Sequence, residues 1–176
     1  MKKEVVIYGA GGHARVIASL VKNHLREVSC FFDDQESKQG NVLRYDKAIF
    51  PDAEMIIAVG NNTARQRLAQ EVAHDFGTFV HPAATVDTDV ILGEGTVILA
   101  NAVVQANVKI GAHVIINAGA VVDHDAIVED YVHIAPNACI GGGAHIEKGA
   151  VIGAGAVVSR FARVKANTAV PPLTVV

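Results

Sequence analysis

Cysteine is scarce in this chain, with only two among 176 residues, and this argues against a disulfide framework. Cys30 and Cys139 both fall in segments that we expect to be strands, and their separation matches no metal-site spacing. Because isolated thiols are typical of proteins from a reducing compartment, we expect a cytoplasmic protein.

The chain also lacks an excess of positive charge and any long apolar run. Its 15 Lys and Arg against 18 Asp and Glu leave a formal net charge of -3, which provides no cationic field for nucleic acid or anionic lipid. The apolar stretch near the N-terminus breaks at Gly9, too early for a signal peptide, and no later stretch is typical of a membrane-spanning helix. We therefore expect a soluble protein that acts on a small molecule, with no nucleic-acid binding and no membrane insertion.

The second half of the chain has a repeat of six residues. From Val80 to Val170, every sixth residue is Val, Leu or Ile, and the register never slips. The members are Val80, Val86, Leu92, Ile98, Val104, Ile110, Ile116, Val122, Val128, Ile134, Ile140, Ile146, Ile152, Val158, Val164 and Val170. A period of six fits neither an amphipathic helix nor a simple alternating strand.

Two further columns of the repeat predict a stacked coil. Small residues that fit a narrow interior stand four positions after many of these aliphatics: Thr96, Ala102, Val108, Ala120, Ala126, Ala138, Ala144, Ala150 and Ala156. Residue types that enter turns with positive φ stand three positions after them: Asp89, Gly95, Asn101, Asn107, Gly119, Asp125, Asn137, Gly143, Gly149 and Gly155. Each hexad is then a strand and a corner, three hexads close one coil, and coils stack about 4.8 Å apart. We predict a parallel β-helix, whose left hand is taken from known hexapeptide proteins and opposes the usual crossover.

Residues 1–79 follow the pattern of a βαβ unit. Strands are predicted at Val5–Tyr8, Val28–Phe32 and Met55–Val59. The first predicted helix has Val16, Ile17, Leu20 and Val21 on one face. The second is capped by Thr63, and its Ala64, Leu68 and Val72 align at four-residue spacing. The chain is therefore expected to have an α/β half-Rossmann domain (1–79) followed by an all-β domain, the left-handed parallel β-helix (80–176).

The segment Gly9–Ala14 predicts a nucleotide site. It fits the Gly-x-Gly-x-x-Gly/Ala fingerprint between a strand and a helix, where glycines let the backbone approach a diphosphate. Gly11, Gly12 and His13 lie in this loop, and Asp33 and Asp34 end the second strand. The alternative is a merely tight turn. Since about 79 residues provide only one mononucleotide half, a nucleotide-linked sugar fits better than NAD.

Two further predictions concern residues of the candidate site. Gly60 and Asn61 follow the third strand and are expected to line the same crevice, with a simple turn as the alternative. His124 stands between Asp123 and Asp125, and a carboxylate beside an imidazole orients it and makes it more basic.

The neighbours of His124 leave alternatives open. Gly142 falls one coil later beneath His124, and His133 stands on a nearby corner. Asp125 occupies the turn column, so one alternative is that it is there for its conformation alone and that Asp123 orients the imidazole. The alternative for His124 is a solvated surface histidine. A metal is not expected, because the histidines lack a third partner at zinc-site spacing.

An apolar stripe of corner residues indicates an oligomer. Val97, Val103, Ile115, Val121 and Ile127 are expected to project outward from a lone helix. Exposed apolar patches of this kind usually meet a partner, and threefold packing would bury them in a homotrimer.

The chain resembles the bacterial sialic acid O-acetyltransferase family of hexapeptide sugar acyltransferases, close to the UDP-4-amino-sugar N-acetyltransferases of the bacillosamine pathway. The segments that carry the resemblance are Tyr8–His13, Phe31–Asp34, Ala58–Asn62 and His124–Asp125. It implies acetyl-CoA as co-substrate, a site between subunits of a trimer, and direct attack on the thioester without an acyl-enzyme.

The resemblance also implies individual roles. His124 matches the general base and Asp125 its polarising partner. His133, Gly142 and Ala154 match positions that meet acetyl-CoA, whereas the nucleotide sugar is held at Gly11, Gly12, His13, Asp33 and Asp34. Because relatives continue further past Val170, the resemblance implies an incomplete site for the adenine end of the coenzyme.

The expected reaction is transfer of acetyl from acetyl-CoA to the 4-amino group of a UDP-linked 4-amino-6-deoxy sugar. Two alternatives within the enzyme class are O-acetylation of sialic acid and N-acetylation of a GDP-linked amino sugar. An alternative from another class is a nucleotide-sugar-binding trimer without turnover, which the short C-terminal end motivates.

Overall fold

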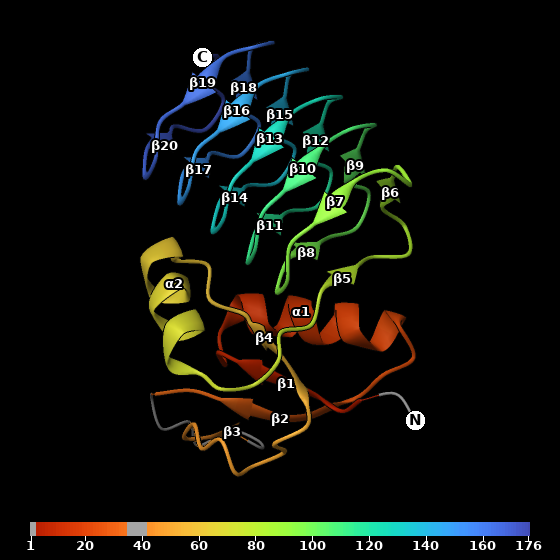
Figure 1. Cartoon of the computed structure of the whole chain (residues 1–176), viewed down its shortest axis with the longest axis vertical. Helices are drawn as coiled ribbons and strands as arrows, with labels where there is room; N and C mark the ends of the chain where they lie inside the picture. The colour runs from red at the N-terminus through yellow and green to blue at the C-terminus, as the bar shows by residue number, and fades with distance from the viewer. Residues whose placement is uncertain (1–2, 35–41) are drawn as a thin grey trace.

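A computed structural model describes residues 3–34 and 42–176 of the chain. It has an α/β domain below and a three-sided stack of short strands above (Figure 1). The elements of the α/β domain are β1 (Val5–Tyr8), α1 (Gly12–Asn23), β2 (Val28–Phe32), β3 (Val42–Leu43), β4 (Glu54–Ile57) and α2 (Asn62–Glu71). No helix among these described residues has the length and apolar character needed to cross a bilayer.

The sheet of the α/β domain is parallel, with strand order β3-β2-β1-β4. Alternation along β1 divides its side chains between two cores, because successive residues of a strand point to opposite faces. Val5 and Ile7 pack with α1 and the solenoid, whereas Val6 and Tyr8 pack with Leu68 of α2. The two helices therefore cover opposite faces of one sheet, and the carboxyl ends of β1, β2 and β4 open toward the glycine loop.

Local predictions in this domain need three corrections. Val16 is 47% exposed, and Ala14 takes its place on the buried face of α1. Asn61, not Thr63, caps α2, because its side-chain oxygen accepts a hydrogen bond from the backbone of Ala64. The third strand begins at Glu54 and ends at Ile57, before the predicted end at residue 59.

The second half is a solenoid of two-residue strands, as the hexads predict. The strands are β5 (Phe79–Val80), β6 (Thr85–Val86), β7 (Ile91–Leu92), β8 (Val97–Ile98), β9 (Val103–Val104), β10 (Lys109–Ile110), β11 (Ile115–Ile116), β12 (Val121–Val122), β13 (Ile127–Val128), β14 (His133–Ile134), β15 (Cys139–Ile140), β16 (His145–Ile146), β17 (Val151–Ile152), β18 (Val157–Val158), β19 (Arg163–Val164) and β20 (Ala169–Val170). Each pairs in parallel with the strand one coil away, as Ile116 does with Ile134. The aliphatic column and the small-residue column fill one continuous core.

The corners of the solenoid use the left-handed backbone region more widely than the residue types indicate. Gly, Asn and Asp occupy most positions with positive φ, but His113, Tyr131 and Phe161 adopt it as well, with φ between 55° and 59°. The expectation for Asp89 is wrong, since it does not fall among the positive-φ corners. The first corners of the stack therefore turn differently from the later ones.

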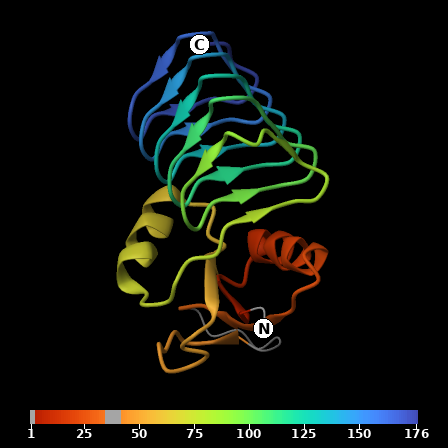
Figure 2. The ribbon, with the colours of Figure 1, turned by 45° about the vertical axis from the view of Figure 1, so that its right-hand side comes forward.

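The three sides of the solenoid are three sheets, and the two domains meet on one of them (Figure 2). Val97 and Ile115, on the sheet β20-β17-β14-β11-β8-β5, are each 2% exposed because they pack against α1 and β1. The expected single apolar stripe is therefore wrong, since these two residues are covered within the chain and Ile127 lies on a third sheet.

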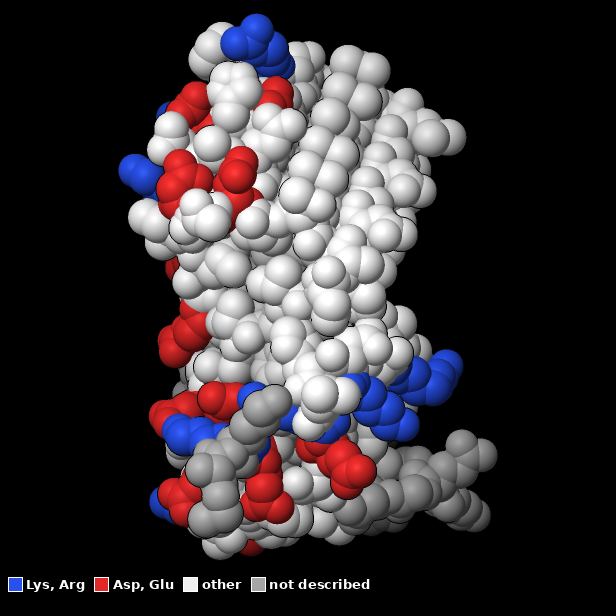
Figure 3. Space-filling view, turned by 90° about the vertical axis from the view of Figure 1, so that its right-hand side faces the viewer, with Lys and Arg blue, Asp and Glu red and all other residues white. Residues whose placement is uncertain are grey.

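A different side of the solenoid is apolar and uncovered. The sheet β18-β15-β12-β9-β6 presents Val103, Val121, Cys139 and Val157 outward. Figure 3 shows a broad area of the solenoid without charged side chains. Residues 171–176 extend this sheet, because Val175 pairs with Val157.

Candidate active site

A histidine–aspartate pair lies at the corner between β12 and β13. The Nδ1 atom of His124 is 2.7 Å from Oδ2 of Asp125, and 44% of the imidazole side chain is exposed. Asp125 has φ of 60°, so it makes the corner and also contacts the imidazole. The hydrogen bond from His124 is the main cause that holds the pKa of the Asp125 carboxyl below its usual range.

Asp123 contacts the same histidine in a different way. Its Oδ1 accepts a hydrogen bond from the backbone nitrogen of His124 at 2.8 Å and lies 3.9 Å from the ring nitrogen Nε2. Asp123 therefore fixes the backbone of the corner, whereas Asp125 engages the imidazole. With Nδ1 facing Asp125, Nε2 is the ring nitrogen that faces Gly142.

Gly142 lies directly against the imidazole of His124 in the next coil. A Cβ atom at Gly142 would stand 2.9 Å from Nε2 of His124 and 3.2 Å from Oδ2 of Asp123. A side chain there would displace the ring, because such distances are below normal contact. Glycine at this position therefore leaves space beside Nε2 of the histidine.

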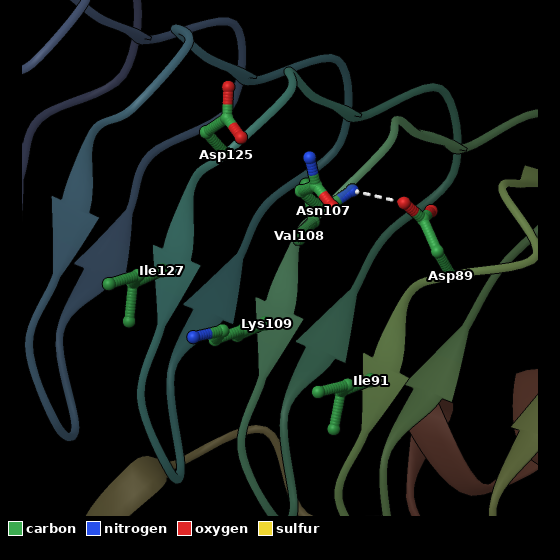
Figure 4. A pocket seen from close by; sticks show the side chains of 7 residues that line it. All are labelled: Asp89, Ile91, Asn107, Val108, Lys109, Asp125 and Ile127. Carbon is green, nitrogen blue, oxygen red and sulfur yellow. Dashed lines mark hydrogen bonds between the residues drawn. The ribbon is translucent and has the colours of Figure 1, made fainter.

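Asn107 is a member of this site that the sequence analysis missed. It occupies the corner one coil before Asp125, and its side chain contributes a hydrogen bond that also lowers the pKa of Asp125. The backbone nitrogen of Asn107 donates to Asp89 at 3.1 Å. These corners border a groove of about 350 Å³, which Ile91, Lys109 and Ile127 also line (Figure 4). The sequence does carry a signal for Asn107, because it precedes Asp125 by eighteen residues, the length of one coil.

The glycine loop has the geometry of an anion site. Gly11 is the N-cap of α1 and provides no side-chain cap, so the first amides of the helix are not claimed by a side chain. A Cβ atom at Gly11 would meet nothing within 4 Å. The loop is fixed from below, because the backbone nitrogen of Ala10 donates to Oδ2 of Asp33 at 2.8 Å.

The second acidic residue of the predicted site is held by protein groups. Oδ1 of Asp34 accepts a hydrogen bond from the Tyr8 hydroxyl at 2.6 Å, and Oδ2 lies 3.5 Å from Arg67. Burial and the nearby Asp34 carboxylate raise the pKa of Tyr8. Asp33 and Asp34 are thus brought beside the glycine loop, where they also brace it.

Gly60 and Asn61 form part of the junction between the domains. The carbonyl oxygen of Gly60 lies 3.2 Å from Nδ1 of His133, whose Nε2 is 2.8 Å from the side-chain nitrogen of Asn117. Burial lowers the pKa of His133. The side-chain oxygen of Asn61 is engaged in capping α2, which agrees with the alternative of a structural turn.

His13 faces the same junction. Burial, followed by the charges of His133 and Arg65, lowers the pKa of His13 to about 4, so its imidazole is neutral at pH 7. Within residues 3–34 and 42–176, no hydrogen-bond partner reaches its buried Nε2 atom. A cavity of about 440 Å³ lies nearby, between α1 and the solenoid, and Gly12, Arg15 and Ala118 contribute to its lining.

The predicted residues divide between two regions of the solenoid. His124, Asp125 and Gly142 lie on the corners that precede β13 and β16. His133 begins β14 and Ala154 follows β17, on the side of the solenoid that meets the α/β domain. One chain therefore brings together His13, Gly60 and His133, but places the His124 pair on another corner.

The sequence matches two family models. Residues 4–72 match the PglD N-terminal domain, and residues 89–124 and 125–160 match the bacterial transferase hexapeptide (six repeats). A solved mutant of GDP-perosamine N-acetyl transferase from Caulobacter crescentus, in complex with CoA and GDP-perosamine, is 30% identical. The similarity covers 98% of this chain and 88% of that one, with a TM-score of 0.91. This chain belongs to the hexapeptide-repeat sugar acetyltransferases.

Further members of these acetyltransferases match to different extents. The acetyltransferase domain of PglB from Neisseria gonorrhoeae, in complex with acetyl coenzyme A, is 26% identical over 99% of this chain and 98% of that one, with a TM-score of 0.73. The UDP-N-acetylbacillosamine N-acetyltransferase of Bacillus subtilis is 39% identical, but the match covers 56% of this chain and 52% of the relative. The aligned part thus spans about half the length of that relative. The parallel β-helix predicted from the hexads, with the left hand taken from known hexapeptide proteins, is the fold that these acetyltransferases share.

Metal ligands do not gather at the site. Among the residues that the structure describes, no group of three His, Cys, Asp or Glu side chains is placed to hold a metal ion.

Proposed function

We propose that the protein transfers the acetyl group of acetyl-CoA to the 4-amino group of a UDP-linked 4-amino-6-deoxy sugar. The observation that carries the proposal is the His124–Asp125 pair. Nδ1 of His124 lies 2.7 Å from the Asp125 carboxylate, and Nε2 of His124 faces Gly142. The 39% identity to the Bacillus subtilis UDP-N-acetylbacillosamine N-acetyltransferase supports UDP as the nucleotide. The Caulobacter crescentus structure with GDP-perosamine makes a GDP-linked amino sugar the second candidate.

The proposed chemistry assigns the proton transfers to His124. Acetyl-CoA supplies an activated thioester when it is bound. Nε2 of His124 accepts a proton from the amine as its nitrogen bonds to the acetyl carbon, and it returns that proton to the departing sulfur. Asp125 holds Nδ1 and stabilises the imidazolium while the proton is on the ring. Cys139 has no part in this scheme, since the amine attacks the thioester directly.

The two domains take different parts in this proposal. Residues 1–79 hold the nucleotide sugar, with the diphosphate at the uncapped amides beside Gly11 and Gly12. Neutral His13 faces the junction near His133 and Arg65, and the carboxylate of Asp33 holds the glycine loop at Ala10. Residues 80–176 supply the base and hold acetyl-CoA along Gly142, His133 and Ala154.

A homotrimer would complete this site. In one chain the His124 corner and the crevice at His133 lie on different corners of the solenoid, so the base would act on a sugar held by a neighbouring copy. The uncovered apolar side with Val103, Val121 and Val157 supports such an assembly.

A panel of acceptors tests the reaction. The protein is incubated with acetyl-CoA and UDP-, GDP- and CMP-linked sugars that carry an amine or a hydroxyl, and products are identified by mass. Acetylation of the UDP-linked 4-amino sugar is expected to be the most efficient. Preference for a GDP-linked amine or for sialic acid would contradict the proposed acceptor. Nucleotide-sugar binding without turnover would contradict the proposal that the protein is an enzyme.

Mixed oligomers test the shared site. His124→Ala chains are combined with Gly11→Asp chains, whose added carboxylate repels the diphosphate. Activity is expected to return in the mixture, because some interfaces join an intact base to an intact crevice. A mixture as inactive as its two components would contradict a site built from two copies.

A further inference from the structure

Helix α2 carries an arginine that is buried between the two domains. Arg65 is 1% exposed and shares the inner side of α2 with Leu68. Its guanidinium reaches the corners of the solenoid at His113 and Tyr131, which are one coil apart. The signal for this residue in the sequence is an arginine in line with the apolar positions of a helix.

The hydrogen bonds of Arg65 join both domains. Nη1 donates to the carbonyl oxygens of Val59 at 3.0 Å and Gly60 at 3.3 Å, which follow β4. Nε donates to the carbonyl of His113 at 2.9 Å and Nη2 to that of Tyr131 at 2.8 Å. One planar group therefore fixes the loop after β4 against two successive coils.

Asn62 extends this contact to a third coil. Its side-chain oxygen accepts a hydrogen bond from Nη2 of Arg65 at 2.8 Å. Its side-chain nitrogen donates to the carbonyls of Gly149 at 2.8 Å and Ala150 at 3.1 Å. The start of α2 is thus attached to the solenoid at three levels.

The acceptors around Arg65 are neutral oxygens, so its role differs from that of an ion pair. Burial lowers the pKa of Arg65 to about 10, which still leaves it charged at pH 7. A buried charge is costly unless hydrogen bonds satisfy it. The rigid fork of a guanidinium makes those bonds directional, which sets geometry more than it adds stability.

The loop that Arg65 holds is part of the acceptor crevice. The carbonyl of Gly60 accepts from Arg65 and also lies 3.2 Å from Nδ1 of His133. We infer that Arg65 is a positioning residue that locks the Gly60–Asn62 loop onto the solenoid and thereby fixes the nucleotide-sugar crevice relative to His133. The inference rests on the proposed function in that the crevice is taken to hold the acceptor.

The experiment compares Arg65→Met and Arg65→Lys with Arg163→Met, which removes an exposed arginine from β19. Amide hydrogen exchange of residues 59–66 is measured first, without ligand. We expect exchange to be at least tenfold faster in Arg65→Met, intermediate in Arg65→Lys, and unchanged in Arg163→Met. In acetyl transfer, the KM for the nucleotide sugar is expected to rise at least tenfold, and that for acetyl-CoA less than threefold.

Several results would overturn the inference. These are unchanged exchange in the folded Arg65 variants, or equal changes in the two KM values, which a general loss of stability would produce. If Arg65→Met does not fold, Asn62→Ala replaces it, with an expected increase in exchange of at least threefold. A wild-type protein that transfers no acetyl group would contradict the proposed function, while the ligand-free exchange would still decide whether Arg65 fixes the loop.

Discussion

Asp125 contacts Nδ1 of His124 from a corner that its own backbone conformation creates. Its φ of 60° belongs to the left-handed region, and its carboxylate lies 2.7 Å from the imidazole. The alternatives of a turn residue and a catalytic partner are therefore compatible in this corner. A rigid solenoid holds both residues, so little reorganisation is needed when the imidazole becomes charged.

Removal of the imidazole tests the base. His124→Ala is expected to lower kcat by at least about 100-fold, in the range by which general bases accelerate reactions, without a change in oligomeric state. His145→Ala is the matched control, since His145 also lies 2.6 Å from a carboxylate, that of Glu129, and the proposed chemistry does not use it. Steady-state kinetics and gel filtration provide the measurements. A His124→Ala enzyme that keeps most of its activity would remove the base assignment.

Two isosteric variants separate the roles of the flanking carboxylates. Asp125→Asn preserves the left-handed corner, which asparagine adopts elsewhere in this solenoid, but it removes the charge that stabilises the imidazolium. We expect kcat to fall at least about tenfold. Asp123→Asn retains an oxygen that accepts from the backbone of His124, so its kcat is expected to fall less than threefold. The opposite order would make Asp123 the orienting group.

The hexad period predicted the architecture of the solenoid because each position in it has one physical requirement. Interior aliphatics, small residues and left-handed corners recur every six residues, and the core confirms the first two columns. The corner column was predicted less well, since His113 and Tyr131 adopt positive φ despite their side chains. There, the fixed path of neighbouring coils outweighs the preference of the single residue.

Contacts between the domains could not be predicted from the period. Val97 looks like any other outward residue of a hexad, and only the position of α1 shows that it is covered. The site residues were found as local patterns, such as His124 with Asp125. Arg65 escaped because its partners on the solenoid are backbone carbonyls, which carry no signature in the sequence.

Two glycines of the nucleotide loop are expected to respond differently to one added methyl group. Gly9 has φ of 114°, and a Cβ atom there would stand 2.8 Å from the carbonyl oxygen of Ala58. Gly9→Ala is therefore expected to reduce the free energy of unfolding by about 1–3 kcal/mol. A Cβ atom at Gly11 meets open space, so Gly11→Ala should keep stability but raise the KM for the nucleotide sugar. Urea unfolding and kinetics measure both effects, and equal destabilisation by the two variants would contradict this distinction.

His113 is expected to make the fold sensitive to acid. It is 3% exposed, stacks on Tyr131 with 5.2 Å between ring centroids, and has no hydrogen-bond partner for Nδ1 among the described residues. Burial, and then the charge of Arg65, lowers its pKa from the ordinary histidine value of 6.5 to about 4. The unfolded chain therefore binds a proton that the folded chain does not bind between these pH values.

The sign of the effect follows from that difference. The unfolding free energy falls as pH drops from 6.5 toward 4, by roughly 2 kcal/mol at pH 4.5 for this one group. His113→Asn removes the titrating group, and asparagine is already found at several left-handed corners. The variant should be less stable than wild type at pH 7, because it loses the ring contacts, but it should lose less stability on acidification. Urea unfolding at pH 7 and 4.5 measures this, and a parallel decline of both proteins would show that His113 is not the group responsible.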